Sequence, residues 1–169
     1  ILTGGATRDL GGSRLYGHLS VWSFSGMNLT FEAGQDWHTI GLTSVSSVVA
    51  ADIDRDRETE IITAGKASDE EPYWVGDSLF AGRDQGQIRV WVKDRVPLEL
   101  RGSFEWRLGD FTRAETVCAS DVNRDGTMEV ITGGTCGWGA QLAIWSKAST
   151  PILVIFLASI TVAGIIALI

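Results

Sequence analysis

Short apolar runs bounded by glycine, aspartate and serine follow one another along the first 147 residues of the chain. The runs are rich in β-branched and aromatic residues, as strands are. The pattern predicts strands at residues 44–53, 60–65, 87–93 and 98–106, which we call strands A, B, C and D. No apolar stripe at helical spacing occurs before residue 150, so the sequence favours an all-β fold.

This four-strand pattern is repeated. Three pairs of residues each stand 69 positions apart: Trp22 and Trp91, Trp37 and Trp106, and Asp52 and Asp121. The second unit supplies strand A at 114–122, strand B at 129–134 and strand C at 141–147. Before the first full unit, residues 1–5, 19–22 and 29–37 read as strands B, C and D. A spacing kept at three points indicates a duplicated structural unit.

Four-stranded units at this period fit the blades of a β-propeller. The sequence therefore predicts a half blade, a full blade at 44–106 and a partial blade at 114–147, followed by a linker and an apolar segment at 148–169. Propellers contain about 4–8 blades. We expect the remaining blades to lie outside this sequence or on other chains, because the chain opens abruptly on a strand B without an initiating Met.

An acidic loop connects strands A and B in each unit. Oxygen-bearing side chains occupy positions 1, 3 and 5 of the loop, and a glutamate returns at position 9. Calcium needs several oxygen ligands, including a backbone carbonyl, which residue 7 would supply. The predicted calcium ligands are Asp52, Asp54, Asp56, Glu58 and Glu60 in the first loop, and Asp121, Asn123, Asp125, Thr127 and Glu129 in the second.

The two loops differ at position 6, where the second has Gly126 and the first has Arg57. Glycine is favoured where a calcium loop turns sharply, so we expect the second site to bind more tightly than the first. An alternative interpretation is that both are Asp-rich turns held by hydrogen bonds from backbone to side chain. The recurrence of the pattern with its closing glutamate favours metal binding.

These motifs resemble the FG-GAP (VCBS-type) repeats that form the propeller blades of integrin α-subunits. The resemblance covers residues 1–147, and it is most specific over residues 121–134, where the closing "EVITGG" is closest in style to archaeal surface repeat proteins. It implies a calcium-stabilised scaffold for adhesion or assembly, without catalytic residues. Arg57, and a glutamate where integrins usually have the last aspartate, depart from the family pattern.

The C-terminal segment from residue 151 to 169 contains 19 residues and no charge. As a helix it would extend ~28 Å, close to the hydrocarbon thickness of a bilayer. We predict a single membrane-spanning helix at residues 152–169, with the propeller on the extracellular face. The alternative of a buried core helix is less favoured, because an all-β domain offers no shell for a helix that is apolar all round.

Composition agrees with a domain outside the cell. The net charge of −7 argues against nucleic acid as a partner. Asn28 begins an N-glycosylation sequon, which matters only in a glycosylating host.

Cys118 on strand A and Cys136 just past strand B would lie almost opposite each other in a hairpin centred near Asp125. Two interpretations remain: the cysteines form a disulfide, or they are two small buried side chains.

Aromatic residues divide into two groups. The repeated tryptophans are expected to pack between blades. Tyr73 and Trp74 instead lie in a long connection at 66–86 that has a short counterpart at 135–140, so they are candidate contacts for other protein subunits or glycans. Strand parity places this connection on the face opposite the acidic loops.

Two functions from different classes remain open. One is a membrane-anchored module of the cell surface or of a membrane complex, for adhesion or assembly. The other is a fragment of a propeller enzyme of lyase or glycosidase type. We favour the first, because no pair of His, Asp or Glu that breaks the repeat is recognisable as a catalytic group.

Overall fold

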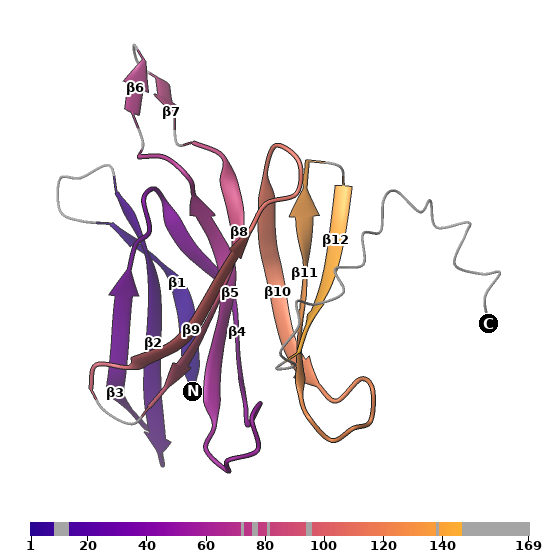
Figure 1. Cartoon of the computed structure of the whole chain (residues 1–169). Coiled ribbons are helices and arrows are strands. Elements are labelled where there is room, and N and C mark those ends of the chain that lie inside the picture. The colour runs from indigo at the N-terminus through magenta and orange to yellow at the C-terminus, as the bar shows by residue number, and fades with distance from the viewer. Residues whose placement is uncertain are drawn as a thin grey trace.

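A computed structural model describes residues 1–8, 14–71, 73–75, 78–80, 82–93, 96–137 and 139–146. All regular structure in these residues is β-strand, which confirms the predicted all-β class (Figure 1). Within them, no helix is long and apolar enough to cross a membrane. The helix predicted at residues 152–169 lies outside the described part of the chain.

The strands form three main antiparallel sheets. The N-terminal sheet contains β1 (Leu2–Arg8), β2 (Leu15–Ser25) and β3 (Asn28–Trp37). The central sheet contains β4 (Thr43–Ala51), β5 (Glu60–Ser68), β8 (Asp84–Val92) and β9 (Glu99–Trp106). The C-terminal sheet contains β10 (Thr112–Ser120), β11 (Glu129–Cys136) and β12 (Gly139–Trp145). A separate hairpin joins β6 (Tyr73–Val75) and β7 (Ser78–Phe80).

The central sheet follows the predicted order A, B, C and D, with each strand paired to the next. The N-terminal sheet contains the equivalents of B, C and D, and the C-terminal sheet those of A, B and C. Even the irregularities repeat. The first pairing of the central sheet has a register shift between Val45 and Ser47, and that of the C-terminal sheet has one between Ala114 and Thr116. The sequence repeat is therefore a structural repeat.

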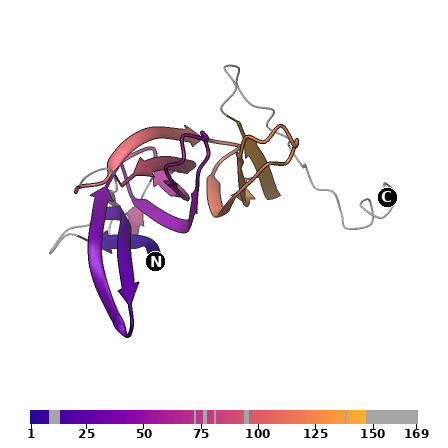
Figure 2. The same ribbon diagram turned by 90° about the horizontal axis from the view of Figure 1, so that it is seen from below.

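The sheets pack face to face in chain order (Figure 2). One buried apolar cluster lies between the N-terminal and central sheets and includes Leu19, Val21 and Ile61. A second lies between the central and C-terminal sheets and includes Ile62, Ile88 and Val130. The described strands do not close into a ring.

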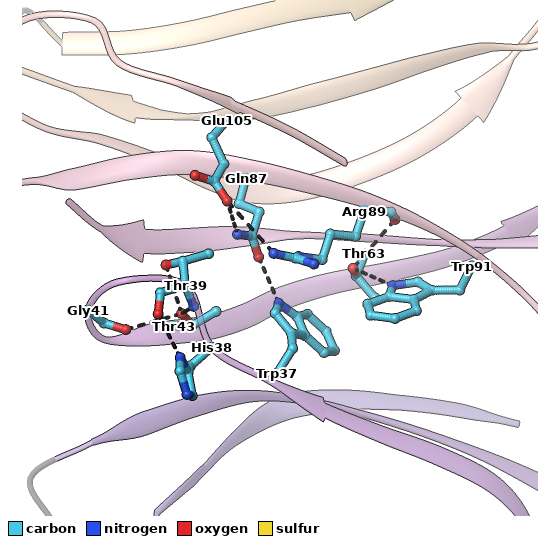
Figure 3. A network of polar contacts seen from close by, with 10 residues as sticks. All are labelled: Trp37, His38, Thr39, Gly41, Thr43, Thr63, Gln87, Arg89, Trp91 and Glu105. Atoms are coloured by element: carbon cyan, nitrogen blue, oxygen red, sulfur yellow. Dashed lines mark hydrogen bonds and ion pairs between the residues drawn. The ribbon is translucent and has the colours of Figure 1, made fainter. Parts of the chain in front are cut away.

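A tryptophan at the end of one sheet joins it to the next. Trp37 ends β3, and its Nε1 donates a hydrogen bond of 2.9 Å to Oε1 of Gln87 in the central sheet (Figure 3). Trp106 ends β9 and donates in the same way, at 2.9 Å, to Oε1 of Gln141. The indole rings also contact Trp91 and Trp145, with centroids 4.7 Å apart in both pairs. These tryptophans pack between sheets, as predicted.

A second repeated hydrogen bond lies within each sheet. The indole of the strand-C tryptophan donates to a threonine on strand B: Trp22 to Thr3 at 3.0 Å, Trp91 to Thr63 at 3.1 Å and Trp145 to Thr132 at 3.0 Å. The bond to Thr63 is buried, whereas that to Thr3 is exposed. An exposed indole N–H that loses its partner can turn to water, and a buried one cannot.

We therefore predict that Thr63→Val lowers the free energy of unfolding by about 1–3 kcal/mol, because it leaves a buried indole N–H without an acceptor. The matched change Thr3→Val should cost less than about 0.5 kcal/mol. Urea unfolding followed by tryptophan fluorescence measures both. Equal losses in the two variants would show that burial does not control this bond.

Candidate functional site

The two acidic loops lie at the same end of the molecule, below β4 and β5 and below β10 and β11 (Figure 1). Their backbones take the same course. Arg55 and Arg124 at position 4 have φ angles of 64° and 61°, and Arg57 and Gly126 at position 6 have 74° and 83°. Arg57 thus adopts the left-handed conformation that favours glycine, at a cost of about 1–2 kcal/mol. The arginine does not prevent the first loop from forming.

The closing glutamates hold both loops from inside. Glu60 and Glu129 are almost completely buried at the start of β5 and β11. Oε2 of Glu60 accepts a 2.9 Å hydrogen bond from the Ile53 N–H, and Oε2 of Glu129 accepts one of 2.9 Å from the Val122 N–H. Each glutamate thus uses one oxygen to hold the loop backbone, and its other oxygen, Oε1, is directed to the side chains of the loop.

In the first loop, three carboxylates converge. Asp52, Asp54 and Glu60 each offer an oxygen within 4.8 Å of the other two. Asp52 also accepts the N–H groups of Arg55 at 2.7 Å and Arg57 at 3.1 Å, which orients its carboxylate. Such a set of hard oxygen ligands suits calcium or another hard divalent cation.

In the second loop, an amide stands among the carboxylates. Asn123 Nδ2 donates to Asp125 Oδ2 at 2.9 Å and to Glu129 Oε1 at 3.1 Å. Its Oδ1 accepts the Asp125 N–H at 2.8 Å. A cation could be held here by Asp121, Asp125 and Glu129 only after the amide turns its oxygen inward. The ligand set that the structure brings together without such a change is that of the first loop.

Both loops contain a buried carboxylate oxygen that lacks a hydrogen-bond donor among the described residues. In the first loop it is Oε1 of Glu60, and in the second it is Oδ1 of Asp121. Such an oxygen costs about 1–3 kcal/mol, which a bound cation would offset. The residues present therefore fit a hard cation at the first loop as it stands, and at the second loop once the Asn123 amide has turned.

Not every predicted ligand joins these groups. Asp56 instead forms an ion pair with Arg101 of β9, at 3.5 Å. The Glu58 side chain pairs with the same guanidinium at 3.6 Å, which leaves its backbone carbonyl, the predicted ligand, unaffected. Asp56 Oδ1 also accepts the Glu58 N–H at 2.8 Å. Its counterpart Asp125 accepts the Thr127 N–H at 2.7 Å. The hydrogen bond from the Thr127 N–H, and to a smaller extent that from the Asn123 amide, lowers the pKa of Asp125 below its ordinary value.

A cavity of about 370 Å³ lies beside the first loop, between the central and C-terminal sheets. Asp54, Glu60 and Arg101 line one part of it, and Phe104 and Trp145 contribute apolar walls. Two of the three converging carboxylates, Asp54 and Glu60, are therefore adjacent to an open space.

A second polar group, which the sequence reasoning missed, lies in the N-terminal sheet. His18 Nδ1 is 2.5 Å from Asp36 Oδ1, and His18 Nε2 is 2.7 Å from Ser20 Oγ. Serine, histidine and aspartate in this order resemble a hydrolytic triad. However, Ser20 is only 2% exposed, and it pairs with strands on both sides of β2.

The repeat explains this group. His18 and Asp36 are paired across β2 and β3, as Gln87 and Glu105 are across β8 and β9. Gln87 Nε2 donates to Glu105 Oε1 at 2.7 Å (Figure 3). His18 therefore occupies the position at which Gln87 receives a tryptophan of the preceding sheet. Aligning strand C across the units would have revealed the correspondence.

Of the two interpretations of the cysteines, the structure excludes the disulfide. Cys118 pairs with Ile131, whereas Cys136 pairs with Thr112, so six residues of strand separate the two positions. At about 3.4 Å per residue this is far beyond the reach of a disulfide. Both cysteines are free, Cys118 exposed and Cys136 buried. The hairpin is centred near Asp125 as expected, but that centre places Cys118 opposite residue 131 or 132, so the expected pairing with Cys136 was wrong by about four residues.

The long connection forms the hairpin of β6 and β7 at the end of the molecule opposite the acidic loops, as strand parity predicted (Figure 1). Tyr73 and Trp74 lie on β6, so the backbone here is regular where the sequence suggested an irregular loop. Asn28, at the start of β3, is exposed beside the turn that joins β2 to β3.

Asp69 anchors the base of this connection. It accepts the Arg83 N–H at 2.7 Å and forms ion pairs with the guanidinium groups of Arg83 and Arg107. Burial raises the pKa of Asp69, but the Arg83 N–H and the Arg107 guanidinium outweigh this effect, so the pKa lies below its ordinary value. Because Arg107 follows β9, Asp69 ties the connection to the end of the central sheet.

Comparisons with known proteins gave no further guide to this site. The chain matched no protein-family model, and a search of the curated proteins gave no match either.

We predict that Asp69→Asn destabilises the protein more at pH 7 than at pH 3. A carboxyl whose pKa is lowered by folding stabilises the native state above its unfolded pKa of about 3.9, and this contribution is lost as the pH falls through the lower native pKa. Urea unfolding at the two pH values measures it. Glu70→Gln removes one charge from the exposed next residue and is the control. An equal loss at both pH values would contradict the assignment.

Proposed function

We propose that this chain belongs to a calcium-stabilised β-propeller of the FG-GAP type, anchored by its C-terminal segment and displayed on the extracellular face. It acts as a structural, adhesion or assembly module of a cell surface or membrane complex. The observation that carries the proposal is the pair of equivalent acidic loops, each with a buried carboxylate oxygen that has no donor in the described structure.

The geometry of the loops supports calcium in particular. The available ligands are all oxygen atoms, and the loop backbone wraps around them as calcium loops do. Glu60 and Glu129 are held at one oxygen by the loop backbone, which fixes the other toward its loop. Affinity in such sites rises with the number of charged ligands. In place of the expectation drawn from Arg57, we therefore propose that the first loop, with Asp54 where the second has Asn123, binds calcium at least as tightly as the second loop does.

The arrangement of the sheets supports a propeller. The three sheets pack in chain order, as successive blades do, and the central sheet is complete with four strands. The hairpin of β6 and β7, which has no counterpart in the C-terminal sheet, provides a projecting element for a protein or glycan partner through Tyr73 and Trp74. The apolar segment at 152–169 would supply the membrane anchor.

Calcium should raise the melting temperature, and a chelator should lower it, because a ligand bound only by the native state stabilises it by about 2.7 kcal/mol at 100 times its Kd. Isothermal titration calorimetry and thermal unfolding measure binding and stabilisation. Glu60→Gln should remove the contribution of the first loop, and Asp121→Asn that of the second.

Glu58→Gln is the matched control, since it removes a carboxylate of the same loop that pairs with Arg101 while the backbone carbonyl at position 7 remains. This variant should keep both sites. A wild-type protein that neither binds calcium nor melts higher in its presence would refute the calcium proposal.

The second candidate, a propeller enzyme, is favoured only by the group of His18, Ser20 and Asp36. A structural role predicts that the protein hydrolyses p-nitrophenyl acetate no faster than a buffer control, and that His18→Gln folds normally, because glutamine fills the same position in the other sheets. A catalytic role predicts hydrolysis above background that Ser20→Ala abolishes.

A further inference from the structure

Two hydrogen bonds cross the interface between the central and C-terminal sheets. One joins strand A of one sheet to strand A of the other, and the second joins the two acidic loops. The Val117 N–H donates to Ser47 Oγ at 3.1 Å. Arg55 Nη2 donates to the carbonyl oxygen of Asp125 at 3.2 Å. Both bonds connect residues that lie 70 positions apart, one repeat and one further residue along the chain.

Gly126 makes the arginine contact possible. A Cβ atom placed at Gly126 would lie 1.5 Å from Nη2 of Arg55, and the φ angle of Gly126 is 83°. Glycine therefore serves two purposes here: it permits the turn of the second loop, and it leaves room for the arginine that crosses from the first.

The residues that make these contacts have counterparts on the face of the C-terminal sheet turned away from the central sheet, which we call the trailing face. Thr116 is the counterpart of Ser47, and Arg124 is the counterpart of Arg55, with nearly the same φ. Both are exposed. Arg124 forms no hydrogen bond or ion pair with any residue that the structure describes.

The apolar residues of this face show the same relation. Ile88 of the central sheet is 6% exposed, whereas its counterpart Leu142 is 38% exposed. Ile53 packs against the buried cluster between the sheets, whereas its counterpart Val122 is 47% exposed. At these positions of strands A and C and of the acidic loop, the trailing face thus repeats an established interface without the sheet that covers it.

We infer that the trailing face is a docking surface for one further sheet of the same repeat. The incoming sheet would carry a leading strand equivalent to β10, whose N–H binds Thr116. Its acidic loop would offer a carbonyl oxygen and a glycine to Arg124. This inference deepens the proposed assembly function, but it rests on the repeated interface and does not depend on calcium.

A second copy of this chain does not fit the surface equally well. β10 lies across β4, β5 and β8, so strand A provides the main contacts of the incoming sheet. The N-terminal sheet, as described, begins with the equivalent of strand B and has no strand in the position of β10. A copy docked through that sheet would leave the central part of the trailing face uncovered.

Extending the repeat tests the inference. A second copy of residues 92–145 is inserted after Trp145, so that every junction matches one already present in the chain. Ala140→Gly in the original sheet makes room for the added Trp106, because a Cβ atom at the equivalent Gly86 would lie 2.7 Å from that ring. Measurements are made with a chelator present.

In the extended chain, Arg124→Ala in the original unit should lower the melting temperature by a few degrees, as Arg55→Ala should in the native chain. In the native chain, Arg124→Ala should have no measurable effect. An effect of Arg55→Ala with none of Arg124→Ala in the extended chain would overturn the inference. So would an extended chain that shows no cooperative unfolding by tryptophan fluorescence.

Cys118 gives a second measurement, because it lies exposed on the trailing face where the central sheet has Val49. In the extended chain, the added copy of Cys118 is changed to valine so that only the original Cys118 is followed. Maleimide labelling of the original Cys118 should be fast in the native chain and more than about tenfold slower in the extended chain. Buried Cys136 is the control. The inference would be overturned if Cys118 were labelled at the same rate in both chains, or slowly in the native monomer. It would also be overturned if a dimer of the native chain protected Cys118.

Discussion

The packing of one sheet onto the next depends on an indole N–H that crosses between them. A tryptophan at the end of a sheet is too large to be covered by its own strands, and its N–H needs an acceptor once it is buried. Gln87 and Gln141 supply that acceptor from the following sheet. Each sheet therefore depends on the next one to complete its hydrogen bonding. The stability of the fold is then the sum of contributions from the sheets and from the interfaces between neighbouring sheets.

The acidic loops depend on the same packing. Their closing glutamates are buried because β5 and β11 lie inside their sheets. Arg101 of the outer strand β9 restrains the first loop, and Arg55 of the first loop restrains the second. A carboxylate oxygen can remain buried without a donor only where the surrounding sheet holds it firmly. The loops are thus tied to the scaffold by these contacts, and a cation there would strengthen contacts within a sheet and near its interface.

Much of this architecture could be predicted from the sequence, because strand positions follow from apolar runs and turn residues. The predicted strand ends at Trp37 and Trp106 are those of the structure. The side-chain details could not be predicted. The spacing of Asn123 identifies an oxygen ligand, but the direction of its amide depends on Asp125 and Glu129. Likewise, Arg57 reads as a poor turn residue, yet it adopts the left-handed conformation while its N–H binds Asp52.

Two glycines fix the alignment of the strands. Gly17 faces Trp37, and Gly86 faces Trp106, and a Cβ atom at either glycine would lie within 2.8 Å of the ring. A slip of two residues, which keeps every side chain on its own face, would put Ile88 or Asp84 beneath Trp106. Such a slip is sterically blocked. The pairing of the outer strand is therefore set at the strand end far from the hairpin turn, so loops at the turn can vary in length and sequence without changing the register.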